Sequence, residues 1–203
     1  MIVKLINLKR DKIRFVIISV LPEYQKKEIN ELSKELYDLS GSVTALLYPP
    51  HITLRTGAIV PIDKVNSYII GFRNYIDKFL AKRIEKDLIK FDKLDFTFYY
   101  DNETKKNIIA YFIKMNPWLK ELNKTLDEYN DFKKSKKKKK FNPHISLAYD
   151  DLSDDNLVKC KNHINSNKEK YYDFLSFKLS DISLFYQRDD GYWDEFYTIN
   201  LGE

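Results

Sequence analysis

Two of the three histidines in this 203-residue chain lie in closely similar segments, YPPHITLRTG at 48–57 and FNPHISLAYD at 141–150. In each segment a proline precedes the histidine, and a Thr or Ser stands two residues after it, between two aliphatic residues. Because side chains alternate between the two faces of a β-strand, a strand through either segment presents its imidazole and its hydroxyl on the same face. The four residues are His51, Thr53, His144 and Ser146.

Two imidazoles on opposite sides of one groove suit an in-line displacement at phosphorus. In that reaction the nucleophile enters opposite the leaving oxygen, so a proton acceptor and a proton donor are needed on opposite sides. Imidazole, with an unperturbed pKa of about 6.5, serves in either role near neutral pH. The two hydroxyls can donate hydrogen bonds to the non-bridging phosphate oxygens, whose charge must be stabilised in the transition state. The alternative, two structural histidines on strands, does not account for the paired hydroxyls.

The same alternation adds a third residue to each face, Arg55 in the first segment and Ala148 in the second. A guanidinium at this place could bind a phosphate through two parallel hydrogen bonds, although Arg55 could also be a surface arginine at a strand end. Three tyrosines are further candidates for substrate binding: Tyr48 precedes the first motif, and Tyr186 and Tyr192 flank the last turn. Each ring could stack on a nucleobase or could simply pack in the core.

The third histidine, His163, lies in a polar segment without a hydroxyl neighbour, and we predict that it is exposed and outside the site. A zinc site is poorly supported, because two histidines without a third ligand of matching spacing leave the coordination incomplete. We therefore expect neither a metal nor a cofactor.

The elements that must position these side chains alternate along the chain. Stretches rich in β-branched and aromatic residues predict strands, and apolar residues at helical spacing predict helices. We expect strands at 13–21, 48–57, 88–100, 107–115, 141–150, 174–187 and 192–201. We expect helices at 22–41, 61–82, 117–130 and 152–172, with Gly41 as a stop and Ser153 as a cap. The segments 101–106 and 188–191 read as turns.

This order of elements occurs twice. From Pro22 to Pro117 is 95 residues, and from His51 to His144 is 93. A period this long is not that of a solenoid repeat. Because the histidine motif recurs at the matching place in each half, we interpret the chain as two copies of one α+β unit that face each other.

Two His-aliphatic-Thr/Ser-aliphatic motifs at this distance closely resemble those of the 2H phosphoesterase superfamily, which includes bacterial 2′–5′ RNA ligase-like proteins and cyclic phosphodiesterases. The resemblance covers nearly the whole chain and extends to its last hairpin. It implies a single domain, 1–203, of two intertwined lobes, with an α+β, pseudo-two-fold, bilobal fold in which two antiparallel sheets line a central cleft and helices lie outside. Two features depart from the family: Tyr149 stands where many relatives carry Arg or another polar residue, and a lysine tract is not a family hallmark.

By this resemblance His51 and His144 are the general acid–base pair, and Thr53 and Ser146 bind the phosphate. The expected activity is metal-independent cleavage of a 2′,3′-cyclic phosphate or a 2′–5′ link in nucleotides, oligonucleotides or RNA ends. Three alternatives stay open: a 2′–5′ RNA ligase or end-processing enzyme, a hydrolase of cyclic oligonucleotide messengers of the phage anti-defence type, and a non-catalytic nucleotide- or RNA-binding module.

The composition is that of a globular protein, with 43% hydrophobic residues and no apolar run long enough to cross a membrane. The lone Cys160 excludes an intramolecular disulfide and fits a reducing compartment. The amino end lacks the apolar stretch of a signal peptide. We therefore expect a cytoplasmic monomer without a membrane partner.

The net charge of +5 is concentrated in the tract KKSKKKKK, from Lys133 to Lys140. The tract contains seven lysines, so the remaining chain carries a net charge of −2. It could be a solvated loop, or it could attract the phosphates of an RNA substrate without reading a DNA or RNA sequence. Only three residues separate the tract from His144, and this position favours the RNA contact.

Overall fold

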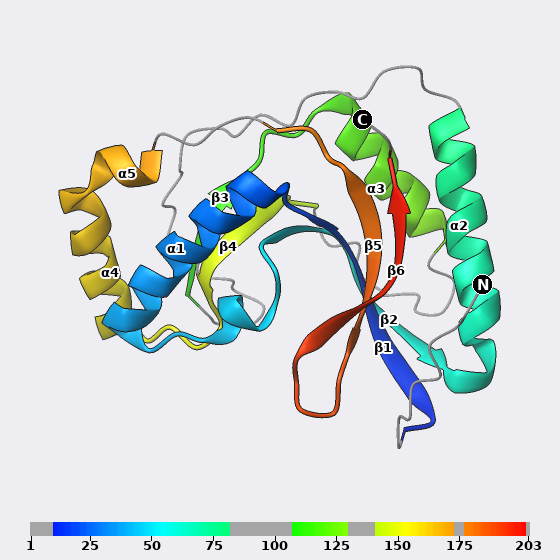
Figure 1. Ribbon diagram of the computed structural model, residues 1–203, viewed down its shortest axis with the longest axis horizontal. Coiled ribbons are helices and arrows are strands. Elements are labelled where there is room, and N and C mark those ends of the chain that lie inside the picture. Colours follow the sequence, from blue (N-terminus) through cyan, green and yellow to red (C-terminus); the bar gives the residue numbers. More distant parts are fainter. Residues whose placement is uncertain (1–9, 82–106, 130–140, 173–176, 202–203) are drawn as a thin grey trace.

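The computed structural model describes residues 10–81, 107–129, 141–172 and 177–201. Three sequence predictions lie outside these residues: the strand at 88–100, the turn at 101–106 and the lysine tract from Lys133 to Lys140. The helices and strands that are described follow one another in the predicted order (Figure 1).

The strands form two antiparallel sheets. The larger sheet has the order β2-β1-β5-β6, made of β1 (Lys12–Val20), β2 (His51–Pro61), β5 (Asp181–Gln187) and β6 (Trp193–Asn200). The smaller sheet pairs β3 (Ile108–Phe112) with β4 (His144–Tyr149). Together with the helices, these sheets confirm the predicted α+β class with two antiparallel sheets.

Helix ends lie where the sequence places proline, glycine and a capping serine. Helix α1 (Glu23–Ser40) follows Pro22 and ends at Gly41, whose φ of 72° is a left-handed conformation that glycine adopts without steric cost. Helix α4 (Asp154–Ser166) begins after Ser153, whose hydroxyl oxygen accepts the Asn156 N–H. The other helical elements are η1 (Thr44–Leu47), η2 (Ile62–Lys64), α2 (Val65–Ala81), α3 (Pro117–Tyr129) and α5 (Lys168–Tyr172).

Two predicted helices differ from the observed ones. The helix predicted at 61–82 begins at Val65, because Pro61 still belongs to β2 and the short η2 follows it. The helix predicted at 152–172 is interrupted between α4 and α5 at Asn167, whose side-chain amide donates to the His163 carbonyl. Asparagine side chains compete in this way with the backbone bonds of a helix, which explains the break.

Helices flank the larger sheet on one side and the smaller sheet on the other (Figure 1). Helices α2 and α3 cover one face of the larger sheet, and α1 lies against the smaller sheet with α4 and α5 outside it. From Phe15 to Ser19, strand β1 is buried on both faces. Phe15 stacks on Tyr68 of α2, whereas Val16 and Ile18 pack with Phe185 on the opposite face. Burial of such side chains contributes about 1.5–3 kcal/mol each and fixes the strand that pairs with β2.

Gly71 of α2 faces the ring of Tyr129 of α3. A Cβ added there would lie 2.7 Å from the ring of Tyr129. The Tyr129 hydroxyl donates a hydrogen bond to the Tyr68 carbonyl, so the tyrosine ring is fixed against α2. The absence of a side chain at Gly71 therefore permits this packing.

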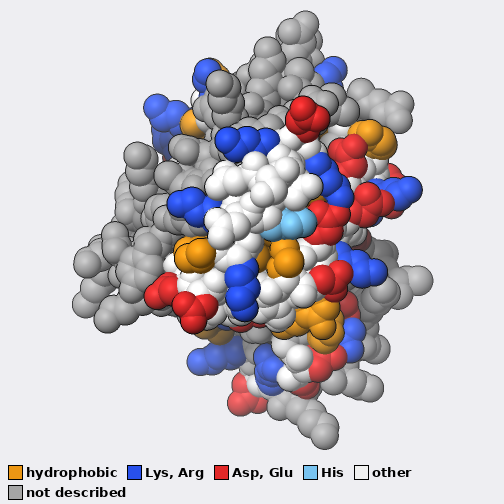
Figure 2. All heavy atoms as spheres, turned by 90° about the vertical axis from the view of Figure 1, so that its left-hand side faces the viewer, with side chains coloured by type: hydrophobic (Ala, Val, Ile, Leu, Met, Phe, Trp, Pro, Cys, Tyr) orange, Lys and Arg blue, Asp and Glu red, His pale blue; other side chains and the backbone are white. Residues whose placement is uncertain are grey.

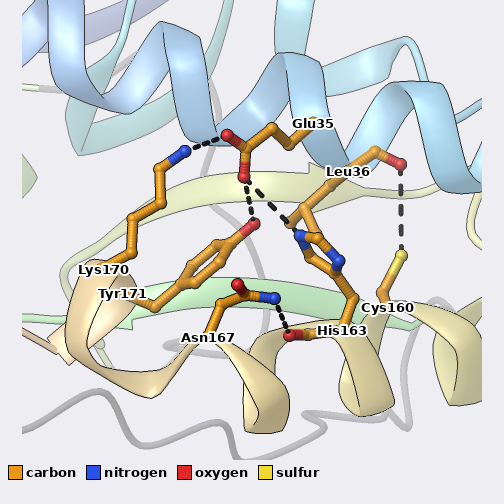
Figure 3. A network of polar contacts seen from close by, with 7 residues as sticks. All are labelled: Glu35, Leu36, Cys160, His163, Asn167, Lys170 and Tyr171. Carbon is orange, nitrogen blue, oxygen red and sulfur yellow. Dashed lines mark hydrogen bonds and ion pairs between the residues drawn. The ribbon is translucent and has the colours of Figure 1, made fainter.

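A polar network around Glu35 joins α1 to α4 and α5 (Figure 3). The Glu35 carboxylate accepts hydrogen bonds from Lys170 and from the Tyr171 hydroxyl and lies 3.6 Å from the His163 ring. Burial alone would raise the pKa of Glu35, but these donors outweigh it and hold the pKa below its ordinary value. His163 thus contributes to helix packing, and its side chain is 32% exposed. None of the described helices combines the length and apolarity that a bilayer crossing requires.

Candidate active site

The two histidine strands pair with their neighbours in the same way. The His51–Val20 pair corresponds to the His144–Phe112 pair. In the same way, the Thr53–Ile18 pair corresponds to the Ser146–Ala110 pair. Directly after the hydroxyl residue each strand carries one unpaired extra residue, Leu54 in β2 and Leu147 in β4, which is a β-bulge. The same register and the same bulge support an internal repeat at the level of these strand pairs.

Each imidazole is oriented by a backbone carbonyl two residues earlier. His51 Nδ1 lies 2.8 Å from the Pro49 oxygen, and His144 Nδ1 lies 2.8 Å from the Asn142 oxygen. A carbonyl oxygen only accepts hydrogen bonds, so Nδ1 carries the hydrogen in both rings and the neutral ring has its lone pair on Nε2. His51 Nε2 lies 3.2 Å from the Thr53 hydroxyl. Both histidines are therefore prepared to exchange a proton through Nε2.

Both histidines line one cavity of about 540 Å³, a volume typical of small-molecule sites. Strands β2 and β4 are in contact, so the cavity receives side chains from both sheets. Six of the residues singled out in the sequence line it: Tyr48, His51, Thr53, Arg55, His144 and Ser146. The site that was predicted from two separate segments is thus brought together in one place.

Tyr186 and Tyr192 do not line this cavity. Tyr186 packs edge-to-face on Phe196 and belongs to the main core, on the face of the sheet opposite to Phe185. Tyr192 lies in the turn before β6 and is 50% exposed. The aromatic residue that the last hairpin supplies to the cavity is Trp193, because β6 begins there and its side chain turns to the Phe185 face.

The bulge at Leu147 makes one prediction for the second strand wrong, namely that Ala148 shares a face with His144 and Ser146. Ala148 is buried in the core instead of lying beside His144 and Ser146, and Tyr149 lines the cavity in its place. An extra residue in a strand reverses the alternation beyond it, and no feature of the sequence marked this position.

Other cavity residues were not anticipated from the sequence. They include Arg14 of β1, Asn123 of α3 and Asn142 before β4. A signal existed only for Arg14, since it is a charged residue within an otherwise apolar strand segment, IRFVIISV. Asn123 donates to the Leu54 carbonyl, so it fixes the bulge of β2 as well as lining the cavity.

Burial lowers the pKa of His51 to about 4, and the nearby His144 acts in the same direction against the Pro49 carbonyl. Burial likewise lowers the pKa of His144. Both rings are therefore neutral at pH 7. An anionic phosphate between them would raise both pKa values, because an opposite charge favours the protonated ring. Burial raises the pKa of Tyr48 to about 12, so its phenol remains protonated.

Arg55 forms an ion pair with Asp127 of α3, with Nε 3.0 Å from the carboxylate. The bulge at Leu54 reverses the alternation of side chains, so Arg55 pairs with Ile17 and its side chain lies on the face opposite to His51 and Thr53, which corrects the prediction that the three residues share a face. In the part of the chain that the structure describes, no three His, Cys, Asp or Glu side chains gather in a way that could hold a metal ion. The groups present are suited to proton transfer by the imidazoles and to anion binding by the hydroxyls.

One wall of the cavity is tied to β4 by Asp151. Its carboxylate accepts hydrogen bonds from the Ser42 hydroxyl at 2.5 Å, the Val43 N–H at 2.7 Å and the Thr44 N–H at 3.2 Å. Burial would raise the pKa of Asp151, but these donors outweigh it and lower the pKa. The carboxylate therefore connects the end of the second histidine strand to η1, which leads into Tyr48 and the first histidine strand.

No protein-family model matches this sequence, and no curated protein does either. Solved structures do match its fold. The crystal structure of apo LigT from E. coli aligns with a TM-score of 0.52 at 15% identity, over 96% of this chain and 100% of LigT. LigT in complex with NADP+ aligns with a TM-score of 0.55 at 15% identity, over the same shares.

A further structure, described as a phosphoesterase, aligns with a TM-score of 0.51 at 15% identity, over 94% of this chain and 99% of that protein. The chain therefore has the fold of LigT along nearly its whole length. This confirms the fold that the two histidine motifs predicted.

Proposed function

We propose that the protein is a 2H phosphoesterase, a metal-independent phosphodiesterase that acts on 2′,3′-cyclic phosphates or 2′–5′ links in nucleotides or RNA ends. One observation carries this proposal. Two imidazoles, each followed by a hydroxyl residue at the same register of an equivalent strand pair, line the same cavity. A core histidine has no need of this arrangement, whereas a displacement at phosphorus requires it.

The proposed reaction opens a 2′,3′-cyclic phosphate with one water molecule. One neutral imidazole removes a proton from the water through Nε2, and the water oxygen forms a bond to phosphorus. The bond from phosphorus to one ribose oxygen breaks on the opposite side, and the second imidazole, protonated in the complex, gives its proton to that oxygen. The product is a nucleotide with a terminal phosphate monoester. Thr53 and Ser146 donate hydrogen bonds to the non-bridging oxygens during the transfer.

The central test is replacement of each histidine. His51→Ala and His144→Ala should each lower kcat for hydrolysis of a 2′,3′-cyclic nucleotide by about 10²–10⁴-fold, the usual contribution of one proton-transfer group. His163→Ala is the matched control, because this ring lies in the Glu35 network outside the cavity, and it should retain full activity. Addition of EDTA should not change the rate. Full activity in either cavity variant, or inactivation by EDTA, would contradict the proposal.

The substrate is best identified with a panel. Cyclic mononucleotides, 2′–5′ oligoadenylates and cyclic oligonucleotides, supplied without metal, report on hydrolysis and on the product isomer. End-labelled RNA that carries a cyclic phosphate, mixed with RNA that carries a 5′-hydroxyl, distinguishes cleavage from ligation by product length. Binding of these compounds without any turnover would favour a recognition module.

A further inference from the structure

Arg14 differs from the other described arginines in its partners. Arg10, Arg55, Arg73 and Arg188 each form an ion pair with an aspartate. Arg14 is exposed at the cavity and has no carboxylate partner among the described residues. A guanidinium without a counter-charge at the edge of a cavity is a binding group for an anionic part of a ligand.

The guanidinium is held in place by an aromatic platform. Its central carbon lies 5.7 Å from the centre of the Trp193 ring, a cation–π contact. Trp193 is only 8% exposed and packs with Val16, Ile18 and Phe185, so the ring below the guanidinium is fixed. Stacking occupies one face of the guanidinium and leaves the N–H donors at its edge available for hydrogen bonds.

A continuous set of rings leads from this guanidinium to the catalytic histidine. Trp193 stacks on Tyr48 at 5.2 Å with an interplanar angle of 24°, and Tyr48 lies 5.1 Å from the His51 ring. Along β1, Arg14 stands six residues before Val20, the residue paired with His51, which is roughly 20 Å of extended strand. The rings of Trp193 and Tyr48 lie between the guanidinium and His51, so we place the anion that Arg14 binds apart from the phosphate between the imidazoles.

We propose that Arg14 binds a second phosphate of the substrate, so that the preferred substrate is an oligonucleotide with a phosphodiester beyond the one that reacts. This inference rests on the proposed function and narrows it, because a 2′,3′-cyclic mononucleotide has only the reacting phosphate. On the outer face over α4 and α5, Figure 2 shows acidic and basic side chains interspersed, as in the pairing of Lys170 with Glu35.

The test compares two substrates that differ by one adenosine and its phosphodiester: adenosine 2′,3′-cyclic phosphate, and the 3′–5′-linked diadenylate that ends in the same cyclic phosphate. Arg14→Ala should raise KM for the dinucleotide about tenfold, as expected for loss of a hydrogen-bonded charge pair. It should leave kcat/KM for the mononucleotide within about twofold. Arg14→Lys keeps the charge but loses the planar fork, so it should be intermediate.

Arg73→Ala is the matched control, because this exposed arginine of α2 pairs with Asp77 and does not line the cavity. It should leave KM and kcat/KM unchanged for both substrates. The increase in KM for the dinucleotide that Arg14→Ala causes should also become smaller as salt is added, since screening weakens an exposed charge contact. If Arg14→Ala lowered kcat/KM equally for both substrates, or changed it for neither, the inference would be overturned.

Failure of the proposed function gives a different result. If the wild-type protein cleaves neither substrate and no 2′–5′ oligoadenylate, the proposed function is wrong, and binding of diadenylate 3′-phosphate still decides the role of Arg14. An affinity about tenfold weaker in Arg14→Ala supports the second phosphate site. Equal affinities in the two proteins refute it.

Discussion

Lowering the pH should destabilise the folded protein through His51, and this can be measured without a substrate. The pKa of His51 is lowered to about 4 in the folded state, against about 6.5 when the chain is unfolded. The unfolded state therefore binds a proton first as the pH falls, and stability is lost between pH 6.5 and pH 4. Relative to pH 7.5, the loss from this group at pH 5.0 is roughly 2 kcal/mol.

The assay is urea unfolding at pH 7.5 and pH 5.0, followed by fluorescence, for the wild type and for His51→Asn. The variant has no imidazole at this position, so its loss of stability between the two pH values should be smaller by about 2 kcal/mol, or roughly 4–8 °C in Tm for a chain of this length. The comparison of differences removes the contributions of all other titrating groups.

His144→Asn provides the matched comparison. Burial lowers the pKa of His144 too, so this variant should also have a weaker pH dependence. Because His144 itself lowers the pKa of His51, the two effects should not add in the double variant. If His51→Asn retained the full pH dependence of the wild type, the imidazole would not be held neutral in the cavity, and the basis of the proposed acid–base pair would be removed.

Two further predictions concern the packing that surrounds the site. Asp151→Ala removes the acceptor of the Ser42 hydroxyl and of two backbone N–H groups. It should lower the free energy of unfolding by about 2 kcal/mol and reduce kcat, whereas Asp151→Asn keeps one acceptor oxygen and should lose about half as much stability. Unchanged midpoints of urea unfolding would contradict this prediction. Gly71→Ala places a Cβ 2.7 Å from the fixed ring of Tyr129. It should destabilise the protein by about 1–3 kcal/mol, despite the better helix propensity of alanine. A raised midpoint of urea unfolding would show that the ring can move.

The parts of the site that could be predicted are those governed by local periodicity. His51 and Thr53 share a face because strand alternation demands it, and the same rule placed His144 beside Ser146. The rule stopped being useful at the two bulges: after Thr53 the extra residue turns Arg55 to the other face, and after Ser146 it buries Ala148. A bulge is decided by pairing with the neighbouring strand, and no short-range pattern records it.

The aromatic side of the cavity shows a second limit. Tyr186 and Tyr192 were reasonable candidates because they flank a turn, yet the cavity receives Trp193. The choice between adjacent aromatic residues depends on where β6 begins to pair with β5, and therefore on register. Arg14 could not be assigned from the sequence for a related reason, since its role depends on the ring of Trp193, far away in the chain.

The distance between the two imidazoles depends on two helices that connect the sheets. Each helix follows a strand of one sheet along the chain but contacts the histidine strand of the other sheet. Helix α1 follows β1 and contacts β4, and α3 follows β3 and contacts β2. The Asn123 side chain of α3 bonds to the Leu54 carbonyl, and Asp151 beyond β4 holds the segment that follows α1. The cavity is thus fixed by contacts that cross between the sheets. A substitution that loosens α1 from β4 or α3 from β2 should separate the imidazoles without touching either, and should reduce stability and turnover together.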